Sequence, residues 1–214
     1  MESDPPHTLS SSTRGVGWLA LGGVVGPAVF VADWAILGII RPGYSPVHDA
    51  ISQLAELGSS TRLAMTAGFV VDGIGLAAFG VALRRLDAGQ AWKFAIVTGL
   101  STLGVAAFPL GTPLSGKIHA AFAVVAYASL VGVPVATAAA NRSRSGRRPR
   151  VPLVVGATAS AALFASVFNI QTHGLAQRVG LTIGDAWVAA TAVGLARRAF
   201  SKVKSLPALP RAVP

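Results

Sequence analysis

Six long apolar runs, separated by short polar segments, form the main pattern along the chain. Each run has about 20 residues, the length of an α-helix that crosses the hydrocarbon core of a bilayer. The third and fifth runs are short for a span. The runs cover residues 17–40, 63–83, 92–110, 118–140, 152–170 and 181–199. The pattern therefore predicts an all-α protein, a bundle of six transmembrane helices.

The polar segment between the first two runs has the pattern of a short amphipathic helix. Ser45 is a suitable N-cap, Pro46 suits the first helical position, and Gly58 is a natural stop. Apolar residues recur at helical spacing on one face and polar residues share another. The apolar positions are Val47, Ile51, Leu54 and Ala55, and the polar positions are His48, Asp49, Ser52 and Glu56. Such a surface helix is either a connector resting in lipid or a lid over a pocket.

The two ends of the chain differ from the apolar middle. Residues 1–14 are rich in Ser and Pro and are expected to form a disordered leader, whereas residues 201–214 form a basic, Pro-rich tail. The first apolar run is not a signal peptide, because it is too long and no basic segment precedes it. The six-helix membrane domain is therefore expected to cover residues 15–200.

Composition supports a lipid environment. The chain has 214 residues, of which 52% are hydrophobic and 12% charged, whereas soluble domains carry about 25% charged residues. The mean hydropathy is +0.60. The net charge of +10 would suggest nucleic acid in a soluble protein. Here the basic residues cluster between apolar runs, as in cytoplasmic loops, so a lipid bilayer is the expected partner and nucleic acid is not.

The basic residues also predict an orientation. With six spans both termini lie on one side of the membrane, and most of the 18 Lys and Arg residues fall on that side. The opposite side holds four, namely Arg41, Arg62, Lys117 and Arg178. Cytoplasmic loops carry the excess of Lys and Arg. The termini are therefore expected to be cytoplasmic, and the segment around residue 48 to face outward.

Three acidic residues fall within or at the ends of apolar runs. Asp33 and Asp72 lie about 10 Å and about 13 Å inside their spans at about 1.5 Å per residue, and Asp185 lies one turn inside the sixth. Ionisable residues at membrane depth mark functional sites by default. The structural alternatives are that Asp72 hydrogen-bonds a neighbouring helix and that Asp185 caps the last span or pairs with Arg178.

Three histidines fall on the outward side: His48, His119 and His173. Zinc sites commonly use three protein ligands and keep one position open, so these histidines are candidate zinc ligands drawn from three separate segments. The chain has no cysteine, which excludes thiolate ligands and disulfides. Arg41 and Arg178 would supply the rim of an outward-facing pocket, with Asp49 and Ser52 in the surface helix.

Several short motifs resemble a bacterial family of multi-span membrane proteins, domain of unknown function 998. They are Pro42-Gly-Tyr-Ser-Pro-Val-His-Asp-Ala-Ile-Ser-Gln-Leu54, Phe108-Pro109, Gly116-Lys-Ile-His119 and Gly174-Leu-Ala-Gln-Arg178. The resemblance implies a multi-pass protein of the bacterial cytoplasmic membrane, without an established reaction. It places Ser52, His119 and Arg178 at motif positions. The family pattern has an acidic residue soon after Phe-Pro, which Asp72 or Asp49 would have to replace here.

Three functions remain open at this point. The first is an integral membrane protein whose outward-facing pocket binds or moves a small molecule, a lipid or a proton. The second is a metal-dependent hydrolase acting on a lipid, by analogy with ceramidases and adiponectin receptors, which join Ser, Asp and three His around zinc in seven spans. The third is a non-catalytic scaffold. The sequence specifies no catalytic residue, substrate or oligomeric state.

Overall fold

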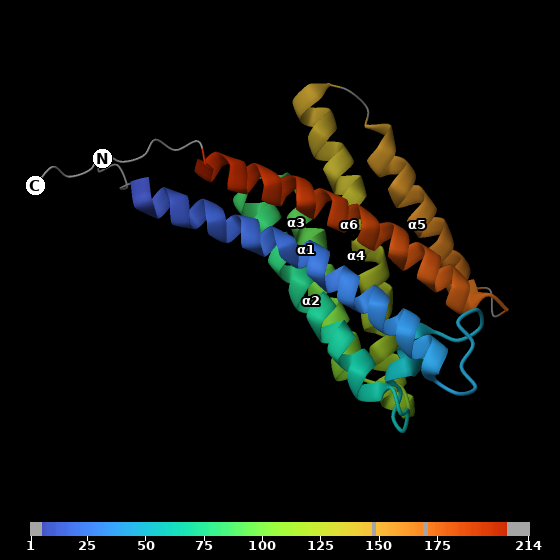
Figure 1. Cartoon of the computed structure of the whole chain (residues 1–214). Coiled ribbons are helices and arrows are strands. Elements are labelled where there is room, and N and C mark those ends of the chain that lie inside the picture. The colour runs from blue at the N-terminus through green and yellow to red at the C-terminus, as the bar shows by residue number, and fades with distance from the viewer. Residues whose placement is uncertain (1–5, 147–148, 169–170, 205–214) are drawn as a thin grey trace, which may run out of the picture.

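The structure is a computed structural model that describes residues 6–146, 149–168 and 171–204. Over these residues the chain forms six α-helices and one short 3-10 helix, without strands (Figure 1). The expected all-α bundle of six helices is thus confirmed. The elements are α1 (Pro6–Ile40), η1 (Ile51–Ala55), α2 (Arg62–Arg85), α3 (Ala91–Ala107), α4 (Pro113–Ser145), α5 (Arg150–Phe168) and α6 (His173–Lys204).

Five of these helices are long and apolar enough to cross a membrane. The sixth, α3, is apolar but has only 17 residues, which gives it a length of about 26 Å at about 1.5 Å per residue. The chain is therefore a multi-pass membrane protein whose third helix is the shortest. The prediction that the third run would be short for a span is confirmed.

The bounds of two helices differ from those expected. Helix α6 begins at His173 rather than near residue 181, because Gln177 and Arg178 are bonded inside the bundle and do not need a solvated loop. Helix α1 begins at Pro6, so residues 6–14 of the expected leader are helical. A proline is well tolerated in the first helical turn. Residues 1–5 of that leader and residues 205–214 of the tail lie outside the described part of the chain.

The start of α1 and the end of α6 lie at the same end of the bundle (Figure 1). Trp18 of α1 meets Phe200 of α6 edge to face, with ring centroids 5.6 Å apart. A side chain at Gly17 would come within 2.7 Å of the same Phe200 ring. The start of α1 and the end of α6 are therefore packed together.

Glycines bring α2 close to both of its neighbours. A Cβ atom placed at Gly75 would lie 2.5 Å from the carbonyl oxygen of Gly22 in α1, and one placed at Gly73 would lie 2.8 Å from that of Gly99 in α3. In a bilayer, helix association depends on such close packing, since lipid is as apolar as the side chains. Helix α2 therefore lies between α1 and α3 as the central element.

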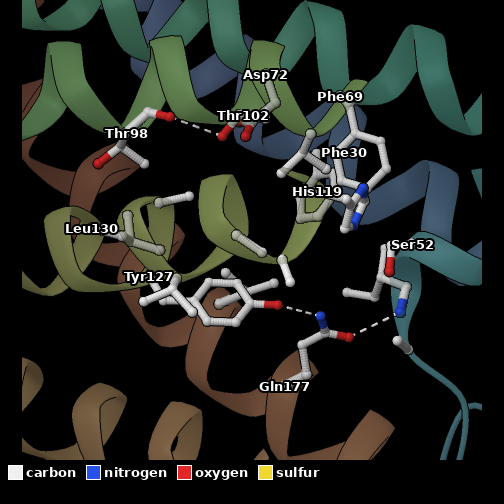
Figure 2. A pocket seen from close by; sticks show the side chains of 18 of the residues that line it. Phe30, Ser52, Phe69, Asp72, Thr98, Thr102, His119, Tyr127, Leu130 and Gln177 are labelled. Carbon is white, nitrogen blue, oxygen red and sulfur yellow. Dashed lines mark hydrogen bonds between the residues drawn. The ribbon is translucent and has the colours of Figure 1, made fainter. Parts of the chain in front are cut away.

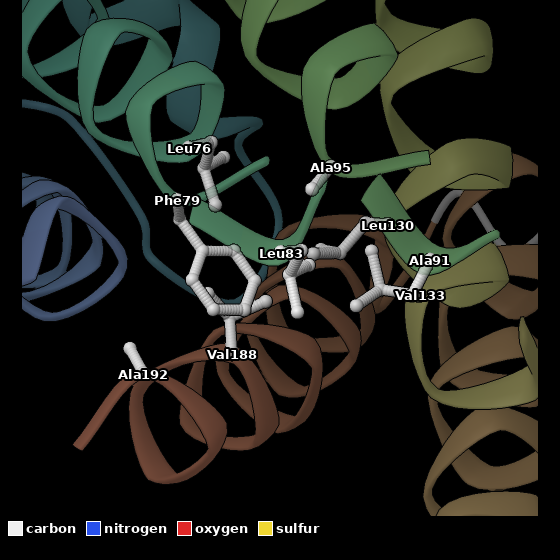
Figure 3. Packing of buried hydrophobic residues seen from close by; sticks show 9 residues of the cluster. All are labelled: Leu76, Phe79, Leu83, Ala91, Ala95, Leu130, Val133, Val188 and Ala192. Carbon is white, nitrogen blue, oxygen red and sulfur yellow. The ribbon is translucent and has the colours of Figure 1, made fainter. Parts of the chain in front are cut away.

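A buried apolar cluster, called the dry core here because it contains no polar side chain, lies in the half of the bundle nearest the helix ends Arg85 and Ala91. Phe79 is fully buried there, between side chains of α3, α4 and α6 (Figure 3). The cluster consists of Leu76, Phe79, Leu83, Ala91, Ala95, Leu130, Val133, Val188 and Ala192. It holds four helices at fixed positions, and the opposite half of the bundle is built on that frame.

The connection from α1 to α2, residues 41–61, closes the other half and is called the cap here. It was expected to contain one amphipathic helix, but it contains a turn followed by η1. Ser45 begins the turn. Its hydroxyl accepts from His48 N at 3.4 Å, and its N–H donates to Asp49 Oδ2 at 2.7 Å. The extended backbone of Ala50 (φ −64, ψ 148) then ends the turn.

The break in the cap directs its apolar side chains inward. Ile51 and Leu54 are 1% and 0% exposed and pack with Phe30, Met65 and Phe69. A continuous helix lying flat on the membrane would leave these side chains in lipid. The cap therefore packs against the end of the helix bundle and does not lie flat on the membrane surface.

Candidate functional site

A cavity of about 320 Å³ lies between α2, α3, α4 and α6, directly below the cap. Its walls are mostly apolar, with Phe30 and Phe69 on one side and Leu181 on another. The polar side chains that face it are Ser52, Asp72, Thr98, Thr102, His119, Tyr127, His173, Gln177 and Asp185. This combination of apolar walls and a few polar groups is typical of small-molecule sites.

Two carboxyl groups, Asp72 of α2 and Asp185 of α6, face this cavity. Both residues are only 4% exposed. One oxygen of each, Oδ1 of Asp72 and Oδ2 of Asp185, is buried without a hydrogen-bond partner. The cavity therefore contains two carboxyls whose bonding capacity the protein does not fill.

The position of Asp185 corrects one structural alternative. Helix α6 begins at His173, so Asp185 lies about 18 Å along it at about 1.5 Å per residue and cannot cap its start. Pairing with Arg178 is also not found, since the Nη atoms of that guanidinium are bonded elsewhere. The pairing of Asp72 with a neighbouring helix likewise does not extend to its Oδ1 atom.

His119 sits at the start of α4 with its ring fixed by the preceding connection. Its Nδ1 atom lies 2.9 Å from the carbonyl oxygen of Phe108. A carbonyl can only accept, so Nδ1 carries the proton and, in the neutral ring, Nε2 is the acceptor. His173 is held similarly, with Nδ1 bonded to the carbonyl of Ser166. Both expected histidines thus line the cavity with their rings oriented by a backbone carbonyl.

Gln177 links the cap to α4 across the cavity. Its Oε1 atom accepts from the backbone N–H of Ile51 at 2.8 Å, and its Nε2 atom donates to the hydroxyl of Tyr127 (Figure 2). Neither side chain is among the site residues predicted from the sequence. A tyrosine within an apolar span is a usable signal, because its buried hydroxyl needs a partner, and Gln177 stands inside a family motif.

Hydroxyl groups of α3 and α4 form a second polar strip. Thr98 donates to Ser129 Oγ at 3.0 Å. Thr102 donates to the carbonyl of Thr98 at 3.0 Å (Figure 2). Thr98 and Thr102 line the cavity on the side where Asp72 enters it. Sequence reasoning missed this strip, since threonine in a span usually bonds only its own helix, as Thr102 also does here.

Arg178 fastens the cap to α6. Its Nη1 atom donates to the carbonyl oxygens of Pro46 at 2.7 Å, Asp49 at 3.0 Å and Gly174 at 2.9 Å. A Cβ atom at Gly174 would lie 2.3 Å from the Asp49 carbonyl, so the glycine lets the cap approach. Arg178 is 5% exposed and acts as a clasp rather than as part of an open rim.

Two aromatic rings complete the environment of Arg178. Its guanidinium carbon lies 5.3 Å from the Trp34 ring centroid and 5.5 Å from that of Tyr44. The Tyr44 hydroxyl accepts from Arg178 Nη2 and donates to the carbonyl of Ala50 at 3.0 Å. Burial raises the pKa of the Tyr44 phenol, and the charge of Arg178 opposes that shift. A phenol with a raised pKa keeps the proton that it donates.

Besides Arg178, four predicted residues lie away from the cavity. Asp33 points from α1 toward α2, where its carboxylate occupies the space left by Gly68. Arg41 donates to the carbonyl of Gln53 within the cap. His48 is exposed, with Nδ1 2.5 Å from the carbonyl of Gln171, and Asp49 serves the Ser45 turn. Of the predicted set, Ser52, Asp72, His119, His173 and Asp185 line the cavity.

The three candidate zinc ligands do not come together. Within residues 6–146, 149–168 and 171–204, no group of three His, Asp or Glu side chains is arranged to hold a metal ion. His119 and His173 face the cavity, but His48 lies on the outer surface of the cap. The hydrolase analogy therefore lacks its ligand set in the part of the chain that the structure describes.

One family model matches the part of the chain that contains the cavity. A family model described as protein of unknown function (DUF998) matches residues 24–194. The chain belongs to this family. The matched range contains every residue that lines the cavity, so the DUF998 region and the cavity coincide. The chain matches no curated protein and no solved structure.

Proposed function

We propose that this DUF998 protein binds a small molecule in the cavity below the cap. The observation that carries the proposal is the pair of buried carboxyls, each with an oxygen that lacks a partner in the protein. A carboxyl at membrane depth costs several kcal/mol unless water, a partner or the bundle interior satisfies it. A bound molecule would supply the missing partner, and the volume of about 320 Å³ suits a small one.

The direction of access follows from the charge pattern. The side of the cap holds four of the 18 basic residues, and the positive-inside rule assigns the richer side to the cytoplasm. The cavity is then open to molecules that come from outside or from the outer leaflet of a bacterial cytoplasmic membrane.

The alternatives of hydrolase and scaffold lead to different expectations. A zinc hydrolase needs a third ligand beside His119 and His173, and the cap does not present His48 to the cavity. A scaffold needs no internal site, so it gives no reason for two carboxyls that face an apolar space. Binding without turnover is therefore the function that we favour.

A cavity-filling variant tests this proposal. Ala123 of α4 lines the cavity, whereas Ala128 on the same helix is exposed on the bundle surface. Protein in zwitterionic lipid nanodiscs is incubated with isotope-labelled 1-octanol and octylamine, and the signal of empty nanodiscs is subtracted. Ala123→Phe is expected to lower bound probe at least ten-fold, because the new ring occupies the cavity.

Ala128→Phe is the matched control, with the same added volume on the lipid side. It is expected to bind as the native protein does. The proposal fails if native protein binds neither probe above the empty-nanodisc level. It also fails if a folded Ala123→Phe protein binds both as well as Ala128→Phe does.

A further inference from the structure

The two carboxyls of the cavity enter it at the same depth from opposite helices. Asp72 is the eleventh residue of α2, counted from Arg62, and Asp185 is the thirteenth residue of α6, counted from His173. Both helices start at the capped end, so the two residues lie about 15 Å and about 18 Å from it at about 1.5 Å per residue. They therefore form one acidic pair across the cavity rather than two separate sites.

The protein provides no cation for this pair. Among the described residues that line the cavity, none is Lys or Arg. Arg178, the nearest basic residue in α6, gives Nη1 to three backbone carbonyls and Nη2 to Tyr44. His119 and His173 face the cavity with their Nδ1 protons already bonded to carbonyls. Two carboxyls in an apolar space cannot both be ionised without a compensating positive charge.

The rest of the cavity selects the kind of cation. Its walls are mostly apolar, formed by Phe30, Phe69, Leu76 and Leu181 among others. An inorganic cation such as Ca²⁺ requires about six to eight oxygen ligands. The acidic pair and its hydroxyl neighbours are surrounded by apolar side chains, which do not supply such ligands. An ammonium group on a short hydrocarbon chain has the donors for the carboxylates and the apolar surface for the walls.

Resting on the proposed function, we infer that the ligand is an amphiphilic amine whose ammonium group lies between Asp72 and Asp185. The ammonium donates to the carboxylates of Asp72 and Asp185, the two acidic side chains that line the cavity. Its chain lies along the aromatic side of the cavity, below Ile51 of η1. Anionic amphiphiles are excluded from this position by the same two carboxyls. The site would thus distinguish an amine from an alcohol or a carboxylate of equal length.

The test compares three probes that differ only in the head group. Octylamine, 1-octanol and octanoate are bound at neutral pH to native protein in zwitterionic nanodiscs, with empty nanodiscs subtracted. Octylamine is expected to bind at least ten-fold more tightly than 1-octanol, and octanoate least. This comparison uses the native chain, so its result does not depend on whether a variant folds.

Three asparagine variants locate the preference. Asp72→Asn and Asp185→Asn should each lower the ratio of amine to alcohol affinity about ten-fold or more. Asp33→Asn is the matched control, since Asp33 is also an acidic residue within a span but does not line the cavity. It should leave the ratio unchanged.

The outcomes separate this inference from the proposed function. If octylamine and 1-octanol bind equally and Ala123→Phe abolishes both, the cavity binds ligands but the inference is wrong. If the amine preference survives both cavity variants, or disappears in Asp33→Asn instead, the acidic pair is not its origin and the inference is overturned. If no probe binds, the proposed function and the inference fail together.

Discussion

The two halves of the bundle are built from the same helices, yet one encloses a cavity faced by two carboxyls and the other contains the dry core. Helix α2 contributes Asp72 to the first and Phe79 to the second, and α6 contributes Asp185 and Ala192. In each helix the two residues are seven positions apart, which is about two turns. The same helix faces therefore change from polar to apolar within about 10 Å. The dry half holds the helices in place, so that the capped half can keep carboxyls without partners.

Two phenylalanines of α2 allow the halves to be compared with one chemical change. Phe79 is fully buried in the dry core, and Phe69, which is 6% exposed, lines the cavity. Phe79→Ala should lower the free energy of unfolding by about 3–5 kcal/mol, because it creates a void in close packing. Phe69→Ala enlarges a space that already exists and should cost less.

Equilibrium unfolding of both variants in the same detergent measures the difference. The Phe69→Ala protein serves as the control for loss of an aromatic ring, since both residues come from one helix. Equal losses of stability would mean that the two halves are packed alike, and the contrast drawn above would be wrong.

The cap offers a smaller and local effect. Arg178→Gln removes charge-assisted bonds to three cap and helix carbonyls and to Tyr44, each worth about 1.5–3 kcal/mol. Loss of even one such bond would speed local opening about ten-fold. We therefore expect amide hydrogen exchange to rise at least ten-fold in residues 44–55 and to stay unchanged in residues 76–83.

Lys117→Gln is the control for this change. Lys117 is an exposed basic residue at the same end of the bundle, so its loss alters charge without touching the cap. Faster exchange in both segments would indicate a general loss of stability. Unchanged exchange in the cap would show that Arg178 does not hold the cap against α6.

The helices were predictable from the sequence because a span leaves a strong apolar pattern. The ends of the helices were harder to predict, and the start of α6 is the clearest example. Gln177 and Arg178 read as loop residues, but the cap and Tyr127 satisfy them inside the bundle, and the helix extends through them. The cap itself was read as a surface helix, because helical spacing does not reveal that Ala50 is extended.

The candidate site shows where sequence reasoning reaches its limit. Asp33 and Asp72 have similar depth and similar neighbours in the sequence, yet only Asp72 faces the cavity. The two residues differ in the side of the helix from which the side chain projects. How each helix is turned toward its neighbours depends on close glycine contacts, such as that between Gly22 and Gly75. Asp185, expected one turn inside its span, lies further along α6 because that helix begins at His173. The roles of Tyr127 and Tyr44 arise from contacts between distant segments and leave no local pattern.

Thiol labelling tests the central claim most directly, because the native chain has no cysteine. Ala123→Cys places a thiol in the cavity, and Ala192→Cys places one in the dry core. A small water-soluble thiol reagent should modify the first and not the second in folded protein in nanodiscs, and octylamine should slow the first reaction. Equal reactivity of the two thiols, or an inert thiol at position 123, would contradict the account.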